Sequence, residues 1–181
     1  MRLPSPVLAI AAALACGSTY APPAVRPMPI AMPGGGREVR VALADGAASG
    51  DVSATGAWVL LRSGGAKTLV RGTGRGTWTV ARHAGGRLRI TNETGETATH
   101  DGPFVARVVD PSAFLTWNGK RYRGELEIRA ADHGIVVINR LPVEQYIRGV
   151  VPLELGVVGE GELAALEAQA VAARSYTYTR L

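Results

Sequence analysis

The sequence predicts an α+β fold in which a β-rich region is followed by two helices. Three observations indicate this. Short apolar runs alternate with polar residues and Gly-rich turns, an Asn-Gly dipeptide joins two more strand patterns, and apolar spacings of three and four residues begin after residue 140. The chain has 181 residues, of which 46% are hydrophobic, so it can bury a core. Because the last helix pattern reaches the final residue, we expect an incomplete domain.

The first region reads as a series of strands. The stretch REVRVAL, residues 37–43, alternates Val39, Val41 and Leu43 with polar neighbours. Similar runs follow between turns such as Gly64-Gly65: AWVLLRS, KTLVRG, GTWTVARH, GRLRITN and PFVARVVD. We interpret residues 37–112 as a β meander.

A tight hairpin is predicted at Asn118-Gly119, since this dipeptide supplies the positive φ angles that such a turn needs. The flanking stretches AFLTW and RYRGELEIR are predicted as its two strands, with Tyr122, Leu126 and Ile128 on one face of the second. A turn at ADHG then leads into the apolar strand IVVIN.

Helical spacing begins at LPVEQYIRGVV, where Pro142 suits a helix start and Pro152 is expected to end the helix. A second helix is predicted from about Gly161, with Glu160 and Glu162 at its amino end, where carboxylates are favourable. Its apolar stripe is Leu163, Leu166, Ala170 and Ala173.

The amino terminus has the pattern of a secretory signal. One positive charge, Arg2, precedes an apolar run at residues 7–15, and ALA at residues 13–15 is a small-x-small cleavage pattern. The run is too short to cross a bilayer, which takes about 20 apolar residues. We expect residues 1–15 to be a signal peptide and the mature protein to be exported, without spanning a membrane.

The single cysteine, Cys16, follows the small-x-small pattern directly, as the lipid-modified cysteine of a bacterial lipoprotein does. Two alternatives stay open: a membrane-anchored lipoprotein, or ordinary cleavage and a secreted or periplasmic protein. Residues 16–36 are rich in Pro and Gly and are expected to form an extended tether. The folded body then has no disulfide.

The formal net charge of +5 is unevenly distributed. Residues 37–129 contain 14 Lys and Arg against 9 Asp and Glu, whereas residues 140–181 contain 4 Arg against 5 Glu. An exported protein does not normally meet nucleic acid, so we expect no nucleic-acid partner. An anionic polymer or lipid surface explains the basic excess, with simple solubility as the alternative.

Three stretches, YRGELEIR, LPVEQYIRGVVPLEL and LEAQAVAARSYTYTR, together resemble the amino-terminal portion of the SpoIID/LytB family. The family is named for the stage II sporulation protein D and the amidase enhancer LytB. The resemblance covers residues 113–181, and RVAL near Val41 is similar to how such proteins often begin. It implies a secreted cell-wall protein, truncated here at its carboxyl end. Characterised members of the sporulation branch are lytic transglycosylases that cleave peptidoglycan glycan strands stripped of their stem peptides.

The family's essential glutamate lies in a VP-x-E context, which implies that Glu154 is catalytic here. Leu153 and Leu155 flank it and Pro152 precedes it, so we expect Glu154 at a helix end beside apolar surface, where desolvation favours the neutral acid. A neutral carboxyl group can protonate a glycosidic oxygen. A lytic transglycosylase needs no second carboxylate, because the C6 hydroxyl of the sugar attacks and the same glutamate accepts its proton. The other glutamates of this region are interpreted as helix-start or solvent-facing charges: Glu144, Glu160, Glu162 and Glu167.

Four residues of the second helix, Gln169, Arg174, Ser175 and Tyr176, match the family pattern AQAVAAR-[ST]-Y and are candidate substrate-binding residues. Arg174 can pair with Glu154 or hold the lactyl carboxylate of a stripped muramic acid through its planar fork. The alternative is an ordinary helix-surface arginine. Ser175 has no nearby histidine to activate it, which argues against a serine nucleophile.

The three histidines, His83, His100 and His133, lie on separate predicted turns without ligand-like spacing, so we expect neither a metal site nor a cofactor. Two functions compete. The first is a glycan-cleaving lytic transglycosylase. The second is a non-catalytic module that binds wall glycan and stimulates an N-acetylmuramoyl-L-alanine amidase. A surface-anchored β protein with only an interaction role is the third alternative.

Overall fold

The structure is a computed structural model that describes residues 36–181 except 63–66, 75 and 157–158. The expected signal peptide, the lipidation site Cys16, the tether up to residue 35 and the Gly64-Gly65 turn lie outside these residues. Within the described part, no helix has both the length and the apolar character needed to cross a membrane.

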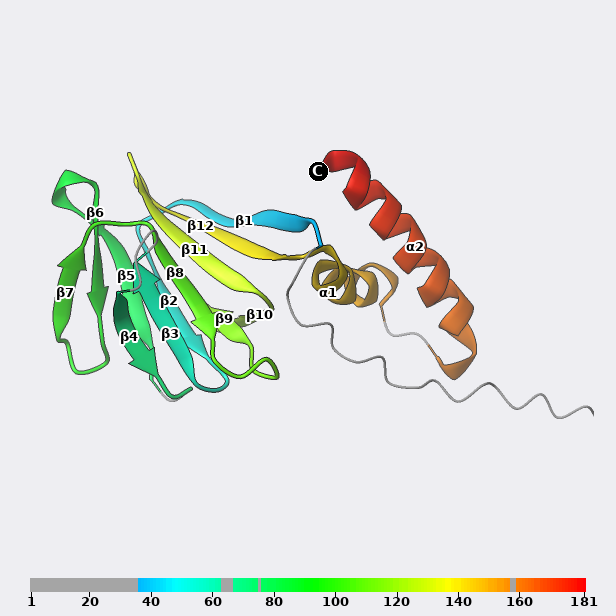
Figure 1. Ribbon diagram of the computed structural model, residues 1–181, viewed down its shortest axis with the longest axis horizontal. Coiled ribbons are helices and arrows are strands. Elements are labelled where there is room, and N and C mark those ends of the chain that lie inside the picture. The colour runs from blue at the N-terminus through cyan, green and yellow to red at the C-terminus, as the bar shows by residue number, and fades with distance from the viewer. Residues whose placement is uncertain (1–35, 63–66, 75, 157–158) are drawn as a thin grey trace, which may run out of the picture. The chain divides into compact units, whose positions relative to one another are not determined.

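The strands form two six-stranded antiparallel sheets in the part of the chain that the structure describes (Figure 1). The first sheet has the order β1 (Glu38–Ala47), β12 (Gly134–Pro142), β11 (Glu125–Ala131), β8 (Phe104–Val108), β3 (Trp58–Arg62) and β4 (Thr68–Gly72). The second has the order β10 (Lys120–Tyr122), β9 (Leu115–Trp117), β2 (Ser49–Ala54), β5 (Trp78–His83), β6 (Arg87–Thr91) and β7 (Thr97–His100).

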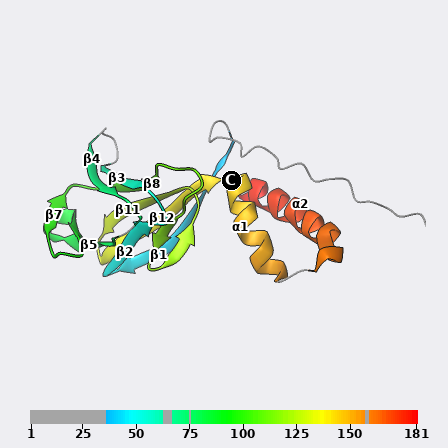
Figure 2. The same ribbon diagram turned by 90° about the horizontal axis from the view of Figure 1, so that it is seen from below.

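Two helices follow the strands: α1 (Val143–Leu155) and α2 (Leu163–Arg180). Two 3-10 turns, η1 (Ala84–Gly86) and η2 (Glu160–Glu162), complete the described elements, which can be followed in Figure 1 and Figure 2. The predicted α+β class is therefore confirmed. Strands from residues 37–112 and from residues 113–181 share both sheets, because β1 pairs with β12 and β2 pairs with β9.

The connections are less simple than the predicted meander. Hairpins and a short meander do occur, as in β5-β6-β7, but the first strand pairs with the last one. The strands β2 and β7 were not predicted, because SGDVSA and TATH carry too few large apolar residues to produce a visible alternation.

The predicted hairpin at Asn118-Gly119 is confirmed, with φ angles of 48° and 77°. The prediction that RYRGELEIR forms one strand is wrong. It forms β10 and β11, which belong to different sheets. The chain turns at Gly124, whose φ is 78°, and a Cβ there would overlap the carbonyl oxygen of Arg140. Only glycine fits this corner, since the positive φ and the close approach both exclude a side chain.

The main core lies between the two sheets and takes alternate residues from both. Its largest fully buried side chains include Trp58, Phe104 and Leu60. Two tryptophans lie over glycines of neighbouring strands, Trp58 over Gly72 and Trp117 over Gly50. At both glycines a Cβ would overlap the indole ring, so each tryptophan occupies the space that a side chain would need.

A second, smaller core joins the helices to the sheet. It contains Val39 of β1, Leu141 of β12 and three residues of α1, with α2 packed on it. The α1 residues are Val143, Ile147 and Val151. Leu166, Ala170 and Ala173 of the predicted apolar stripe pack against this core, which confirms their interpretation, whereas Leu163 is 52% exposed.

Pro152 does not end the first helix as predicted. Helix α1 continues to Leu155 and ends at Gly156, whose φ is 74° and whose N–H donates to the carbonyl of Pro152 at 3.1 Å. A proline removes its own N–H bond, here to the carbonyl of Arg148, but the residues after it can still donate. In the last turn of a helix this loss is small enough for the helix to continue.

The Trp58–Gly72 contact gives a test of the main core. We expect Gly72→Ala to destabilise the fold by about 1–3 kcal/mol, because the new methyl group forces the indole ring to move. Gly149 is the matched control: it lies in α1, and a Cβ there meets nothing within 4 Å. Gly149→Ala should stabilise the fold by up to about 1 kcal/mol through helix propensity. Urea unfolding measures both changes, and equal effects of the two substitutions would contradict the packing described.

Candidate functional site

Glu154 lies in the last turn of α1 and is exposed to solvent. Its neighbours are exposed as well: Leu153 by 85% and Leu155 by 36%. Glu154 therefore lies at a helix end between two apolar residues, as expected, but the expected burial of its side chain is not found. The reason is the extra length of α1, which carries residues 153–155 beyond Val151, the last residue of the small core.

The side chain that contacts Glu154 is Gln169 of α2. Its amide nitrogen donates to Oε2 of Glu154 at 2.5 Å. The two residues come from the two sequence motifs of the predicted site and are 15 residues apart. The antiparallel packing of α1 and α2 therefore brings the predicted catalytic residue and one predicted substrate-binding residue into contact.

Arg174 does not pair with Glu154, which was one of its two expected roles. It binds Glu144 in the first turn of α1 through two hydrogen bonds, from Nε at 2.7 Å and from a terminal nitrogen at 2.8 Å. The bond from Arg174 lowers the pKa of Glu144, and the carboxylate in turn raises the pKa of Arg174. Glu144 lies in the first turn of α1, which agrees with its interpretation as a helix-start charge, but no sequence pattern reveals that Arg174 of α2 lies beside it.

The predicted residues of α2 divide between two sides of the helix. Gln169 and Tyr176 are seven residues apart, about two turns, and so lie on one side. Arg174 is five residues from Gln169, which places it about 140° further around the axis. The structure therefore brings Glu154 into contact with Gln169 and Arg174 into contact with Glu144, whereas Tyr176 lies in the wall of a pocket beside β1.

Ser175 is exposed, and its hydroxyl donates to the carbonyl of Val171 at 2.9 Å, within its own helix. The three histidines are distributed over β5, β7 and the β11–β12 turn. Among the residues that the structure describes, no group of three or more His, Cys, Asp or Glu is arranged to hold a metal ion. Glu162 accepts the N–H of Gly159 at 2.7 Å and so caps the 3-10 turn η2, which directly precedes α2.

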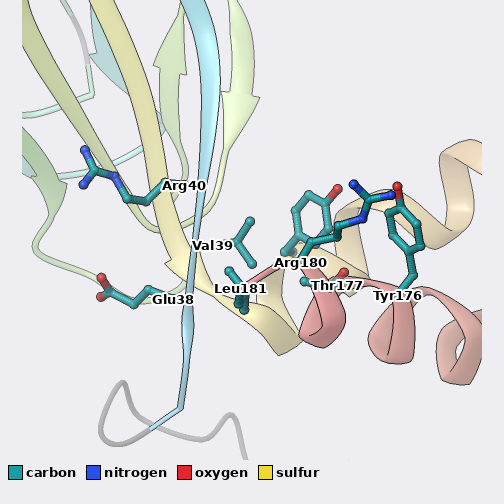
Figure 3. Close-up of a pocket in the computed structure, with 8 residues that line it drawn as sticks. Glu38, Val39, Arg40, Tyr176, Thr177, Arg180 and Leu181 are labelled. Atoms are coloured by element: carbon teal, nitrogen blue, oxygen red, sulfur yellow. The ribbon is translucent and has the colours of Figure 1, made fainter.

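A pocket of about 460 Å³ opens between β1 and the end of α2 (Figure 3). Tyr176 forms part of its wall and is itself 63% exposed. The guanidinium carbon of Arg180 lies 5.2 Å from the centre of the Tyr176 ring, a cation–π distance. The lining residues are Glu38, Val39, Arg40, Tyr146, Tyr176, Thr177, Arg180 and Leu181.

Sequence reasoning found Tyr176 but missed Tyr146 and Arg180. The four-residue spacing of Tyr176 and Arg180, which places both on one side of a helix, is a signal that could have revealed the pair. An exposed aromatic ring beside a guanidinium group provides a stacking face and a carboxylate ligand.

The Glu144–Arg174 pair gives a pH test. Because the folded-state pKa of Glu144 is lowered, its ionised form stabilises the fold above the unfolded pKa of about 4.3, and this contribution is lost as the pH falls through the folded pKa. We expect Glu144→Gln to lower the urea midpoint at pH 7 and to have much less effect at pH 3. The control is Glu167→Gln, an exposed glutamate of α2. A Glu144→Gln effect that is the same at both pH values would contradict the ion pair.

Comparisons with known proteins support the resemblance of the last part of the chain to the SpoIID family. The model of the SpoIID family, described as a stage II sporulation protein, matches residues 131–180. An uncharacterized protein of Brachyspira hyodysenteriae (strain ATCC 49526 / WA1) is 41% identical over 88 residues, which make up 48% of this chain and 23% of that protein. The chain therefore matches about a quarter of the length of this curated relative. No solved structure matches the chain. The predicted resemblance is confirmed over residues 131–180, which match the SpoIID model and include Glu154, Gln169 and Arg174, whereas the stretch YRGELEIR lies outside the matched range.

Proposed function

We propose that the protein acts on peptidoglycan as a lytic transglycosylase, with Glu154 as acid and then as base. In addition to the match with the SpoIID family, one contact gives this mechanism its strongest support. Glu154 is paired with the neutral Gln169 and not with Arg174. An arginine partner would favour the charged carboxylate, whereas the acid step needs the neutral form. An amide can donate to a carboxylate and accept from a carboxylic acid, so Gln169 suits both states of the cycle.

The proposed reaction returns Glu154 to its starting state. The protonated Glu154 gives its proton to the glycosidic oxygen while the bond from that oxygen to the anomeric carbon breaks. The C6 hydroxyl of the muramic acid that carries this anomeric carbon attacks it and closes a 1,6-anhydro ring. The proton of this hydroxyl passes to Glu154. No water is consumed, so no second carboxylate is needed to activate one. Exposure leaves Glu154 accessible to a long glycan strand, and a bound glycan would exclude water from it.

The pocket suggests how the strand is held. We propose that Tyr176 and Tyr146 present apolar ring faces to the sugars and that Arg180 binds a lactyl carboxylate. Arg174 is already occupied on both sides of its fork by Glu144, so we propose that it fixes α2 against α1 and thereby positions Gln169. This differs from the direct ligand role expected for Arg174 from the sequence.

Replacing the acid tests the mechanism. In the full-length protein, we expect Glu154→Gln to reduce cleavage of stripped glycan strands by about 10²–10⁴-fold, because the amide cannot deliver a proton. The measurement is the rate at which anhydro-muramic ends appear, and unchanged thermal unfolding shows that the fold is intact. The control is again Glu167→Gln, which should cleave at the normal rate. Normal cleavage by Glu154→Gln would exclude the mechanism.

A second candidate function is a non-catalytic enhancer that stimulates an N-acetylmuramoyl-L-alanine amidase. The observation in its favour is Leu153, which lies beside Glu154 and is 85% exposed, as a protein-contacting side chain would be. Under this function, we expect no anhydro ends to form and the amidase to act faster in the presence of the protein. Leu153→Ala should reduce this stimulation of the amidase, whereas Glu154→Gln should leave it unchanged. Both functions place peptidoglycan strands as the partner and require neither a cofactor nor nucleic acid.

We also propose that the protein works outside the cytoplasm, secreted or held by a lipid on Cys16. If it is a lipoprotein, labelled palmitate should be incorporated, and Cys16→Ser should abolish the label and release the protein from the membrane fraction. Cys16→Ser is compared with Ser18→Ala, a nearby substitution that should leave the label unchanged. Absence of label, with a mature terminus at another residue, would support plain secretion.

A further inference from the structure

One face of the first sheet carries a row of side chains that crosses all six strands. Each member is the direct cross-strand neighbour of the next, or is joined to it by an ion pair. We call it the arginine row: Arg40, Arg140, Glu125, Arg107, Val59 and Arg71.

The arginine row lies on the face of the sheet opposite the main core. Each member of the row has at least one buried neighbour along its strand, such as Leu60 next to Val59 and Ala106 next to Arg107. Because successive side chains of a strand point to opposite faces, the row points away from the core. The side chains of Arg40 and Arg107 are 52% and 50% exposed, and that of Arg140, which also contacts Glu38 at 3.0 Å, is 33% exposed.

Acidic side chains hold part of the row in place. Glu127, whose side chain is only 6% exposed, lies 3.7 Å from Arg40 and 3.8 Å from Arg140, and it is also hydrogen-bonded to Arg129. Glu125 lies 3.2 Å from Arg107. Within the described residues, Arg71 has no acidic side chain at ion-pair distance.

The face as a whole is positive. Around the row there are five arginines against three glutamates: Arg40, Arg71, Arg107, Arg129 and Arg140 against Glu38, Glu125 and Glu127. The pairs described above order the arginines without cancelling their total charge. An anionic ligand would therefore meet guanidinium groups that are already oriented, which lowers the entropy cost of binding.

The spacing of the row identifies the kind of anion. Arg140, Arg107 and Arg71 lie on alternate strands of the sheet. Neighbouring strands are about 4.8 Å apart, so these three arginines follow one another at about 9.6 Å. This is close to the length of one disaccharide in an extended glycan. A glycan strand stripped of its peptides carries one lactyl carboxylate on each disaccharide, and its charges repeat with the same period.

We propose that the arginine row is a second glycan-binding site, in which Arg140, Arg107 and Arg71 bind the lactyl carboxylates of successive disaccharides. The planar guanidinium fork matches a carboxylate in geometry and charge. The proposal rests on the proposed function only for the identity of the polymer, since it requires no cleavage at Glu154. Such a site retains the protein on a strand between reactions and selects strands whose peptides have been removed.

The test compares two double variants that remove equal charge from opposite sheets. Arg71→Gln with Arg107→Gln removes two members of the row, and Arg87→Gln with Arg89→Gln removes two exposed arginines of β6 in the second sheet. Equilibrium binding of stripped glycan strands is measured at low salt and at physiological salt. We expect the row variant to bind up to about 25-fold more weakly, since an exposed ion pair contributes up to about fivefold. The β6 variant should bind within about twofold of the unmodified protein, and added salt should reduce the difference because it screens exposed charges.

Three results would overturn the proposal. The first is an equal loss of binding in the two double variants, which would mean a diffuse charge effect. The second is equal binding of neutral chitin oligomers of the same length, which lack the carboxylate. The third is tighter binding of poly(glycerol phosphate), which would identify the ligand as a phosphate polymer. If the row variant unfolds, Arg71→Lys with Arg107→Lys replaces it. This variant keeps the charge and loses the fork, and binding as tight as in the unmodified protein would also overturn the proposal.

The same samples separate this inference from the proposed function. Binding that depends on the row, together with no anhydro ends in the unmodified protein, supports the arginine row and rejects the transglycosylase mechanism. Normal cleavage, together with identical binding by the two double variants, rejects the row and leaves the mechanism intact.

Discussion

The pairing of β1 with β12 is the constraint on which the rest of the structure depends. It joins residues about one hundred positions apart, from Glu38 opposite Pro142 to Ala47 opposite Ile135. It completes the first sheet, and it places Val39 and Leu141 side by side beneath α1. It also brings Arg40 next to Arg140, where the arginine row begins, and sets β1 as one wall of the pocket. Loss of this one pairing would therefore affect the core of the helices, the pocket and the row together.

The two charged contacts of the helix pair divide its residues into separate pairs. Arg174 is bound on both nitrogens by Glu144, and Glu154 is left with the neutral amide of Gln169. The two contacts lie near opposite ends of α1, at its first and last turns. The carboxylate of Glu144 thus occupies the guanidinium group of Arg174.

Local patterns in the sequence were sufficient to predict the α+β class, the Asn118-Gly119 hairpin and most strands, because alternation and turn chemistry act over a few residues. They were insufficient for β2 and β7, which carry few apolar residues, and for the corner at Gly124, which is forced by the distant carbonyl of Arg140. Motifs identified Glu154, Gln169 and Arg174. They could not assign the partners of these residues. A contact between two helices depends on the axial shift and the rotation of one helix relative to the other, and no local sequence pattern encodes these two quantities.

Helix α1 begins at the residue directly after β12, without a loop between them. Pro142 ends the strand with a φ of −59°, and the N–H of Val143 donates to the carbonyl of Arg37 at 3.1 Å, so the junction is fixed at both sides. The orientation of the helix is therefore dictated by the twist of the strand. One inserted residue at this junction would rotate the helix by about 100° and turn Ile147 out of its core. The sheet therefore fixes the direction of α1, and with it the position of Glu154, because no loop separates β12 from the helix.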